Sequence, residues 1–138
     1  MKGTFYIDSN VFLYPVLYSG IKEAETAREI LAEIEQKNIQ AYTSTLTWDE
    51  VSYVVEKAFG KTDSIEVGKK FLNFPFLRFI PVDDEIIRRS QFIREKYNLK
   101  PRDSIHLSCA IERNLSKIIT DDADFDGIKE ITRVPIKQ

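Results

Sequence analysis

The chain has 138 residues, of which 43% are hydrophobic, so it has the usual size of one domain and can bury a sizeable core. No apolar run approaches the ~18 residues of a membrane span, no signal peptide is recognised, and a single Cys excludes an internal disulfide framework. The net charge of −2 at face value argues against nucleic-acid binding. These features predict one ordered domain over residues 1–138 in a reducing cytoplasm.

Short apolar runs alternate with amphipathic stretches along the chain. In chain order, the pattern predicts a strand at residues 4–7, a helix at 21–36, a strand at 39–44, helices at 46–59 and 63–74, a strand at 77–82, helices at 84–97 and 101–114, a strand at 117–120 and a short strand at 132–136. Gly60 and Pro75 mark helix ends, and Asp63, Asp83 and Asp84 are interpreted as helix caps. Strands that alternate with helices predict an α/β protein with a parallel sheet and right-handed crossovers.

Two carboxylates stand at the ends of apolar runs. Asp8 follows residues 5–7 (FYI), and Asp122 comes shortly after residues 118–120 (IIT). Both are expected at the carboxyl ends of buried strands, which is the edge of an open α/β sheet where ligands bind. They can meet if the first and fourth strands are neighbours in the sheet, because that adjacency is a topological switch point.

Two further acids, Glu50 and Asp103, lie on predicted helices beside apolar faces. Simpler structural interpretations remain: Asp8 is a helix N-cap, Glu50 is a boundary residue with a solvated carboxylate, and Asp103 is a first-turn acid that interacts with the helix dipole. Residues 120–125 (TDDADF) hold three acids in four positions, whose mutual repulsion a cation or a solvated turn would relieve. His106 either contacts the site, holds a neighbouring carboxylate or, most simply, is a core histidine.

The acids favour an oxygen-ligated hard cation, Mg²⁺ or Mn²⁺, because the only His and the only Cys cannot build a zinc site between them. The acids assigned to one candidate site are Asp8, Glu50, Asp103, Asp122 and Asp124. Without these five, the chain carries 17 acidic and 20 basic residues, a net charge of +3. A metal-loaded site would therefore lie in a mildly basic surround that tolerates a phosphate-bearing partner.

Four motifs resemble those of the PIN-domain family, and within it those of the VapC-like toxin ribonucleases. They are residues 6–11 (YIDSNV), 43–51 (TSTLTWDEV), 101–110 (PRDSIHLSCA) and 118–125 (IITDDADF). Their order and spacing extend over essentially the whole chain. The resemblance implies a three-layer α/β/α fold, in which a parallel five-stranded sheet lies between helices.

The resemblance also implies which residues form the site. The acids are Asp8, Glu50, Asp103 and Asp122, with Asp124 as a supporting member. The polar supports near the metal are Asn10 and Thr120, together with Ser44 or Thr45. Family versions of the last motif read Thr-x-Asp-x-Asp-Phe, so that Asp121 takes the variable position and Asp122 is the preferred main ligand of the two. Ser104 stands where relatives often carry Ala.

These features together give the hypothesis of a metal-dependent endoribonuclease. In it, Asp8, Asp103 and Asp122 hold the metal, while Glu50 and Asp124 orient waters or complete a second ion. Hydrolysis by this route leaves a 5′-phosphate and a 3′-hydroxyl, and a 2′,3′-cyclic phosphate would contradict it. RNA is expected to be bound by its shape and backbone, through nearby basic side chains. The candidates are Lys57, Arg102 and Arg113.

The family further implies a small antitoxin partner and a homodimer, with Phe71, Phe74 and Phe76 as either interface or core residues. Alternatives remain. A housekeeping RNA-processing nuclease of the same fold would need no antitoxin. A haloacid-dehalogenase-like phosphohydrolase expects a second Asp where this chain has Asn10, and a receiver-like signalling domain expects a late-strand Lys, to which only Lys117 comes near. A binding module would have little reason to keep the acids.

Overall fold

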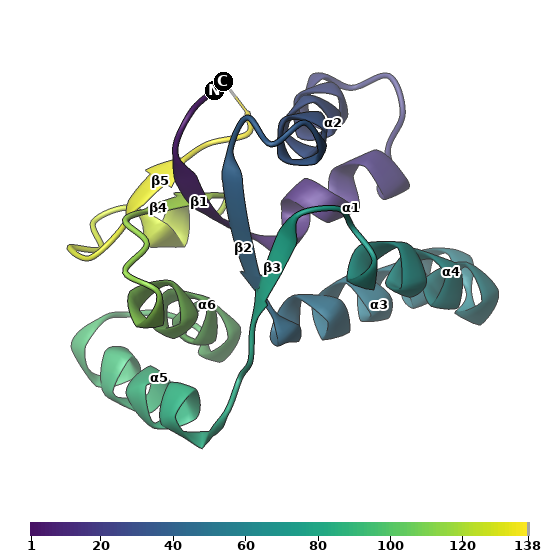
Figure 1. The fold of residues 1–138 in the computed structure, drawn as a ribbon. Helices are drawn as coiled ribbons and strands as arrows, with labels where there is room; N and C mark the ends of the chain where they lie inside the picture. Colours follow the sequence, from purple (N-terminus) through teal and green to yellow (C-terminus); the bar gives the residue numbers. More distant parts are fainter. Residues whose placement is uncertain (138) are drawn as a thin grey trace.

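The structure, a computed structural model, describes residues 1–137 and contains a five-stranded parallel sheet with strand order β3-β2-β1-β4-β5 (Figure 1). The strands are β1 Thr4–Ile7, β2 Gln40–Ser44, β3 Leu77–Ile80, β4 Lys117–Ile119 and β5 Thr132–Val134. The helices are α1 Ser9–Leu17, α2 Lys22–Glu35, α3 Thr45–Phe59, α4 Lys61–Leu72, α5 Asp84–Lys96 and α6 Pro101–Glu112, with a short 3₁₀ helix, η1, at Ala123–Phe125.

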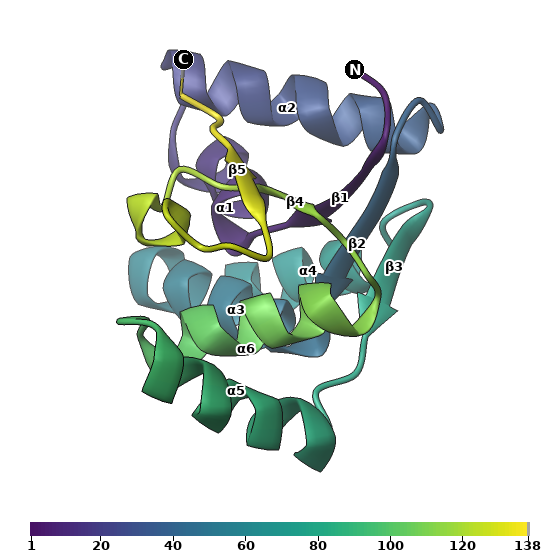
Figure 2. The same ribbon diagram turned by 90° about the vertical axis from the view of Figure 1, so that its left-hand side faces the viewer.

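Helices cover both faces of the sheet, because successive side chains of a strand point to opposite sides. Phe5 and Ile7 of β1 pack in one apolar cluster with residues of α1, α2, α3 and α4. Tyr6, between them, packs in a second cluster with residues of α5 and α6. Figure 2 shows α2 on one side of the strands and α5 with α6 on the other. The predicted three-layer α/β/α fold is therefore confirmed.

The first and fourth strands are neighbours. β1 pairs with β2 on one side and with β4 on the other, and Ile7 lies opposite Ile119 across the β1–β4 pair. The chain builds the sheet from β1 toward β3 and then returns to β4 on the opposite side of β1. The β1–β4 boundary is thus the expected switch point, where the ends of two strands leave a crevice for polar side chains.

Helix α1 is the α-helix that the sequence pattern does not predict. Its buried residues Val11, Phe12 and Leu13 are consecutive, so no stripe with a 3.6-residue period marks it. Pro15 lies inside the helix, which a sequence-based assignment counts against helical structure. The one favourable local signal is Asp8, which occupies the N-cap.

Two of the three expected caps are wrong. Helix α4 begins at Lys61 and α5 begins at Asp84, so that Asp63 and Asp84 lie in the first turns of these helices rather than before them. Asp83 does cap α5, because its Oδ1 accepts a hydrogen bond of 3.0 Å from the backbone N–H of Ile86. Acids suit a first turn as well as a cap, since both positions lie at the positive end of the helix dipole.

Strands β3 and β5 end earlier than expected, at Ile80 and Val134. Each is followed by a proline, Pro81 or Pro135, which has no N–H to continue the ladder of hydrogen bonds. Within residues 1–137, none of the helices combines the length and the apolar character that crossing a bilayer requires.

Candidate active site

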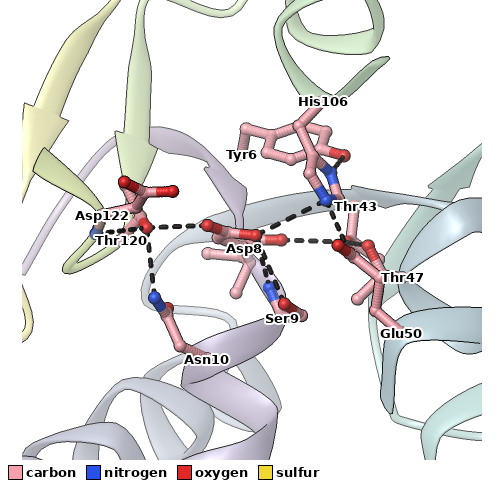
Figure 3. Close-up of polar contacts among 11 residues, drawn as sticks. Tyr6, Asp8, Ser9, Asn10, Thr43, Thr47, Glu50, His106, Thr120 and Asp122 are labelled. Atoms are coloured by element: carbon pink, nitrogen blue, oxygen red, sulfur yellow. Dashed lines mark hydrogen bonds and ion pairs between the residues drawn. The ribbon is translucent and has the colours of Figure 1, made fainter. Parts of the chain in front are cut away.

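The carboxyl ends of β1 and β4 are joined by the side chains of Asp8 and Thr120. Asp8 is 5% exposed and caps α1, and its Oδ1 accepts a hydrogen bond of 2.7 Å from the backbone N–H of Ser9. Its second oxygen, Oδ2, accepts a hydrogen bond of 2.7 Å from the Thr120 hydroxyl (Figure 3). Asp8 is therefore a helix cap that also faces the crevice between the two strands, so the two interpretations of this residue are compatible.

Thr120 connects Asp8 to two further site residues. Its buried hydroxyl accepts a hydrogen bond of 3.2 Å from Nδ2 of Asn10 and one of 3.0 Å from the backbone N–H of Asp122. Asp122 in turn caps η1, because its Oδ1 accepts a hydrogen bond of 2.9 Å from the backbone N–H of Asp124. This network fixes the turn after β4 and holds the Asp122 side chain at the crevice (Figure 3).

Three acids come together beside this turn. Oxygen atoms of Asp103, Asp122 and Asp124 lie within 4.8 Å of one another, although Asp103 belongs to the first turn of α6. Burial, the negative charge of Asp122 and a hydrogen bond with that residue, and the charge of Asp8 together raise the pKa of Asp103 from its ordinary 3.8 to about 7. Carboxylates held this close repel each other, which makes them receptive to a cation.

A second group forms around His106, which is fully buried on α6. Its Nε2 lies 2.6 Å from Oε1 of Glu50 and 3.6 Å from Oδ1 of Asp8, and its Nδ1 lies 2.6 Å from the hydroxyl oxygen of Tyr6. Burial by itself would lower the pKa of His106, but the charges of Asp8 and Glu50 and the hydrogen bond with Glu50 outweigh it and raise this pKa. Of the three interpretations of His106, the structure supports a histidine that holds carboxylates.

An open pocket of about 640 Å³ lies beside the acids, and it is lined by Glu50, Lys100, Pro101, Arg102, Asp103 and Asp122. Arg102 also lies 3.9 Å from Asp49, and both side chains are well exposed. Carboxylates thus face the pocket together with two cationic residues, so it can accommodate a metal ion and a phosphate group at once. Lys57, in the last turn of α3, and Arg113, at the C-cap of α6, are not among the residues that line it.

Asp121 and Asp122, adjacent in sequence, have different surroundings. The Asp121 carboxylate accepts hydrogen bonds from the backbone N–H groups of Ile136 at 2.6 Å and Lys137 at 2.7 Å, and from the hydroxyl of Tyr14 at 3.0 Å. It therefore ties the residues after β5 to α1, while Asp122 lies with the other acids. Ser44 is buried with a hydroxyl that has no hydrogen-bond partner within residues 1–137, and Thr45 accepts a hydrogen bond from the backbone N–H of Val82.

Sequence reasoning did not identify Tyr6 or the pair Thr43 and Thr47. The Thr43 hydroxyl donates a hydrogen bond of 2.8 Å to the carbonyl of Ile7, and this bond joins β2 to the end of β1. The same hydroxyl lies 2.7 Å from the Thr47 hydroxyl. The available signal was chemical: a tyrosine and a threonine at buried positions of a strand require buried hydrogen-bond partners. Such a signal indicates that a partner exists without indicating which residue it is.

The donor set fits a hard divalent cation. Asp103, Asp122 and Asp124 offer oxygen ligands within one ion's reach, and Asp8 adds negative charge close enough to raise the pKa of Asp103. Mg²⁺ and Mn²⁺ prefer oxygen ligands and keep several waters, which an open pocket allows.

A three-layer α/β/α protein with carboxylates at its β1–β4 switch point belongs to a recognisable class. The model of the PIN domain family matches residues 5–131, and the chain therefore belongs to the PIN domain family. A search of the curated proteins found no match.

Similar solved structures come from toxin–antitoxin systems. A toxin–antitoxin complex from Klebsiella pneumoniae is 28% identical with a TM-score of 0.64, covering 93% of this chain and 95% of the other. VapBC2 from Rickettsia felis, bound to a promoter DNA fragment, is 18% identical with a TM-score of 0.72, covering 98% of both chains. The sarcin-ricin-loop-cleaving toxin VapC20 of Mycobacterium tuberculosis is 12% identical with a TM-score of 0.73, covering 88% of this chain and 92% of the other.

Proposed function

We propose that the protein is a metal-dependent endoribonuclease and the toxin of a toxin–antitoxin pair. The observation that carries the proposal is the convergence of acids at one edge of the sheet. Glu50 of α3, Asp103 of α6 and Asp122 of the turn after β4 line one open pocket, and Asp8, directly after β1, lies close enough for its charge to act on Asp103. Membership of the PIN domain family and the similarity to toxin structures support this class of activity. RNA is the proposed substrate because the pocket combines carboxylates with the cationic residues Lys100 and Arg102.

The proposed metal ligands are Asp8, Asp103 and Asp122, with Asp124 near enough to Asp103 and Asp122 to assist them. When bound there, Mg²⁺ or Mn²⁺ supplies a Lewis acid that neutralises charge on the phosphate and lowers the pKa of a water molecule. The metal ligands are held in place by the fold, since Asp8 and Asp122 are both bonded to Thr120.

Glu50 is proposed to orient the attacking water. One of its carboxylate oxygens, Oε1, is engaged by His106, and Glu50 also lines the pocket. Its other oxygen is therefore the one that can accept a hydrogen bond from water. Arg102 and Lys100, on the same pocket, are proposed to contact the phosphates of the RNA strand.

The test is cleavage of end-labelled structured RNA by the purified protein with Mg²⁺, Mn²⁺ or EDTA. Cleavage should require the metal, leave a 5′-phosphate and a 3′-hydroxyl, and be lost in Asp8→Asn, whose circular dichroism spectrum should match that of the parent. Cyclic phosphate ends would exclude the hydrolytic route. Equal cleavage by Asp8→Asn would mean either that the site assignment is wrong or that a contaminating ribonuclease is present.

We also propose an antitoxin partner and a homodimer. Exposed large apolar side chains gather on α3 and α4; they are Trp48, Tyr53, Phe59, Ile65 and Leu72. Three of these, Trp48, Ile65 and Leu72, line one groove of about 370 Å³ between the two helices. An apolar surface of this kind favours a protein partner. Phe71, by contrast, is buried core, Phe74 packs against it, and Phe76 is exposed under the ammonium group of Lys37.

Light scattering on the purified chain tests the homodimer, and co-expression with the product of an adjacent gene tests the antitoxin. A dimer whose RNA cleavage is inhibited by a tightly bound partner protein would fit a toxin. An active monomer that binds no such partner would favour a housekeeping RNA-processing nuclease. The phosphohydrolase is not favoured, because the place of its second Asp is taken by Asn10, whose amide donates a hydrogen bond to Thr120 instead of offering a carboxylate.

A further inference from the structure

His106 links the proposed water-orienting residue to the core of the protein. Its ring is 0% exposed, and it lies on α6 one turn beyond Asp103. Nε2 points to Oε1 of Glu50 on α3, and Nδ1 points to the Tyr6 hydroxyl on β1 (Figure 3). Within residues 1–137, His106 is the only hydrogen-bond partner of the Glu50 side chain. Three elements that are separate in sequence therefore meet at one imidazole ring.

The contact with Glu50 indicates which nitrogen carries a proton. With Glu50 ionised, its carboxylate can only accept hydrogen bonds, and a separation of 2.6 Å between Nε2 and Oε1 of Glu50 then places an N–H on Nε2. With a bare Nε2, two lone pairs would face each other at this distance. The Tyr6 hydroxyl can satisfy Nδ1 in either state, because a hydroxyl both donates and accepts. Nε2 is thus a donor to Glu50 and has no free lone pair for a metal, although Asp8, Glu50 and His106 lie close together.

We propose that His106 is a positioning residue that holds Glu50 in the conformation needed to orient the attacking water, and that Tyr6 fixes the plane of the His106 ring. This inference rests on the proposed nuclease function. Glu50 is a side chain at the edge of the apolar face of α3, and without His106 it would be free to rotate toward solvent. Tyr6 is fully buried and packs edge-on against the ring, with 5.5 Å between the ring centroids. Residues that orient a site from behind typically contribute about 10- to 100-fold to activity.

The first test needs no RNA and no metal. His106 is the only histidine in the chain, so the imidazole signals of protein labelled with ¹⁵N-histidine all belong to this residue. The spectrum should show a proton on Nε2 that exchanges slowly with water, and this signal should move in Glu50→Gln and in Tyr6→Phe. An Nε2 without a proton, or a signal that Glu50→Gln leaves in place, would overturn the inference. This result stands whether or not the protein cleaves RNA, so the failure of the two proposals can be told apart.

The second test is kinetic. His106→Leu removes the donor, and kcat should fall about 10- to 100-fold while KM changes by less than about threefold. His106→Gln places an N–H donor near the position of Nε2 and should restore part of kcat. Ser108→Ala is the matched control, because Ser108 lies on the same helix as His106 and the change removes its buried hydrogen bond to the Ile86 carbonyl of α5, so kcat should stay within about twofold.

A double-mutant cycle decides whether His106 acts through Glu50. If it does, adding His106→Leu to Glu50→Gln should lower kcat by less than about threefold, because the residue that it positions is already lost. Full additivity of the two losses would overturn the inference. A kcat loss in Ser108→Ala as large as that in His106→Leu would assign the effect to packing of α6 and would equally overturn it.

Discussion

Asp8 and Thr120 lie 112 positions apart in the chain and are joined by a hydrogen bond of 2.7 Å between their side chains. The same Asp8 side chain caps α1, and Thr120 binds the backbone of the turn in which Asp122 caps η1. Helix capping and the clustering of acids are therefore two consequences of one arrangement. A parallel sheet brings the ends of β1 and β4 together, and the segments that leave these ends begin with acids because acids stabilise helix starts.

We predict that Thr120→Val destabilises the protein more than its small change in shape suggests. The substitution keeps the volume but removes the donor to Asp8 and the acceptor of Asn10 and Asp122, which leaves buried polar groups without partners. The free energy of unfolding in urea should fall by about 2–3 kcal/mol. Thr132→Val, on the exposed surface of β5, is the matched control and should change it by less than about 0.5 kcal/mol. Equal stability of the two variants would show that the Thr120 network contributes nothing.

Substitutions of Asp121 and Asp122 should have opposite effects, the first on stability and the second on RNA cleavage. Asp121→Ala removes the acceptor for the Ile136 and Lys137 N–H groups and for Tyr14, so the free energy of unfolding should fall by about 2–3 kcal/mol while RNA cleavage per folded molecule persists. Asp122→Asn should abolish cleavage and leave the thermal midpoint unchanged or higher, because it relieves repulsion with Asp103. Urea titration and the cleavage assay on both variants decide the matter. The opposite pattern would make Asp121 the metal ligand.

Alternation of apolar and amphipathic segments was sufficient to predict the parallel sheet, and the position of Asp8 and Asp122 after apolar runs pointed to the β1–β4 boundary. Helix α1 was beyond this reasoning, because three consecutive buried residues and Pro15 leave no helical period in the sequence. Strand ends depended on a different rule, in which Pro81 and Pro135 stop the ladder.

The hydrogen-bond partners within the site could not be predicted. A lone histidine on an apolar helix face has no sequence feature that indicates Glu50, which lies 56 positions away, or Tyr6, which lies 100 positions away. Neighbouring acids in a turn are equally ambiguous, because a rotation of the backbone decides which of Asp121 and Asp122 faces the crevice. Sequence patterns report which face of an element is buried, whereas side-chain pairing follows from tertiary packing.

The stability of the metal-free protein should fall as the pH rises toward neutrality. The pKa of Asp103 is raised to about 7 in the folded protein, from an ordinary 3.8, so the folded state binds this proton more tightly than the unfolded state does. Its contribution is complete below about pH 4 and is lost as the pH rises to about 7. The raised pKa of His106 acts in the same direction, with its contribution lost above the ordinary value near 6.5.

Asp103→Asn isolates this effect. In EDTA at pH 8 the variant should be more stable than the parent by about 1–2 kcal/mol, a discounted figure because solvent screens the half-buried Asp103, and the difference should shrink toward pH 4. Mg²⁺ should stabilise the parent at pH 8 and not the variant, since a ligand that binds only the folded state shifts unfolding by mass action. Thermal melts at several pH values measure both effects. A parent that is more stable than Asp103→Asn in EDTA at pH 8 would show that Asp103 is not under repulsion.

Arg102 should contribute to RNA binding rather than to the chemical step. It lines the pocket with Glu50 and Asp103, and its partner Asp49 lies 3.9 Å away in an exposed pair that stabilises the fold little. Arg102→Ala should raise KM about three- to tenfold, leave kcat unchanged, and reduce the slope of log KM against log salt concentration by about one, as expected when one phosphate contact is lost. Arg88→Ala is the matched control, because Arg88 forms an exposed pair with Asp84 on α5 and does not line the pocket. If both variants weakened RNA binding equally, the effect would come from the change in net charge. The proposal that Arg102 contacts an RNA phosphate would then be wrong.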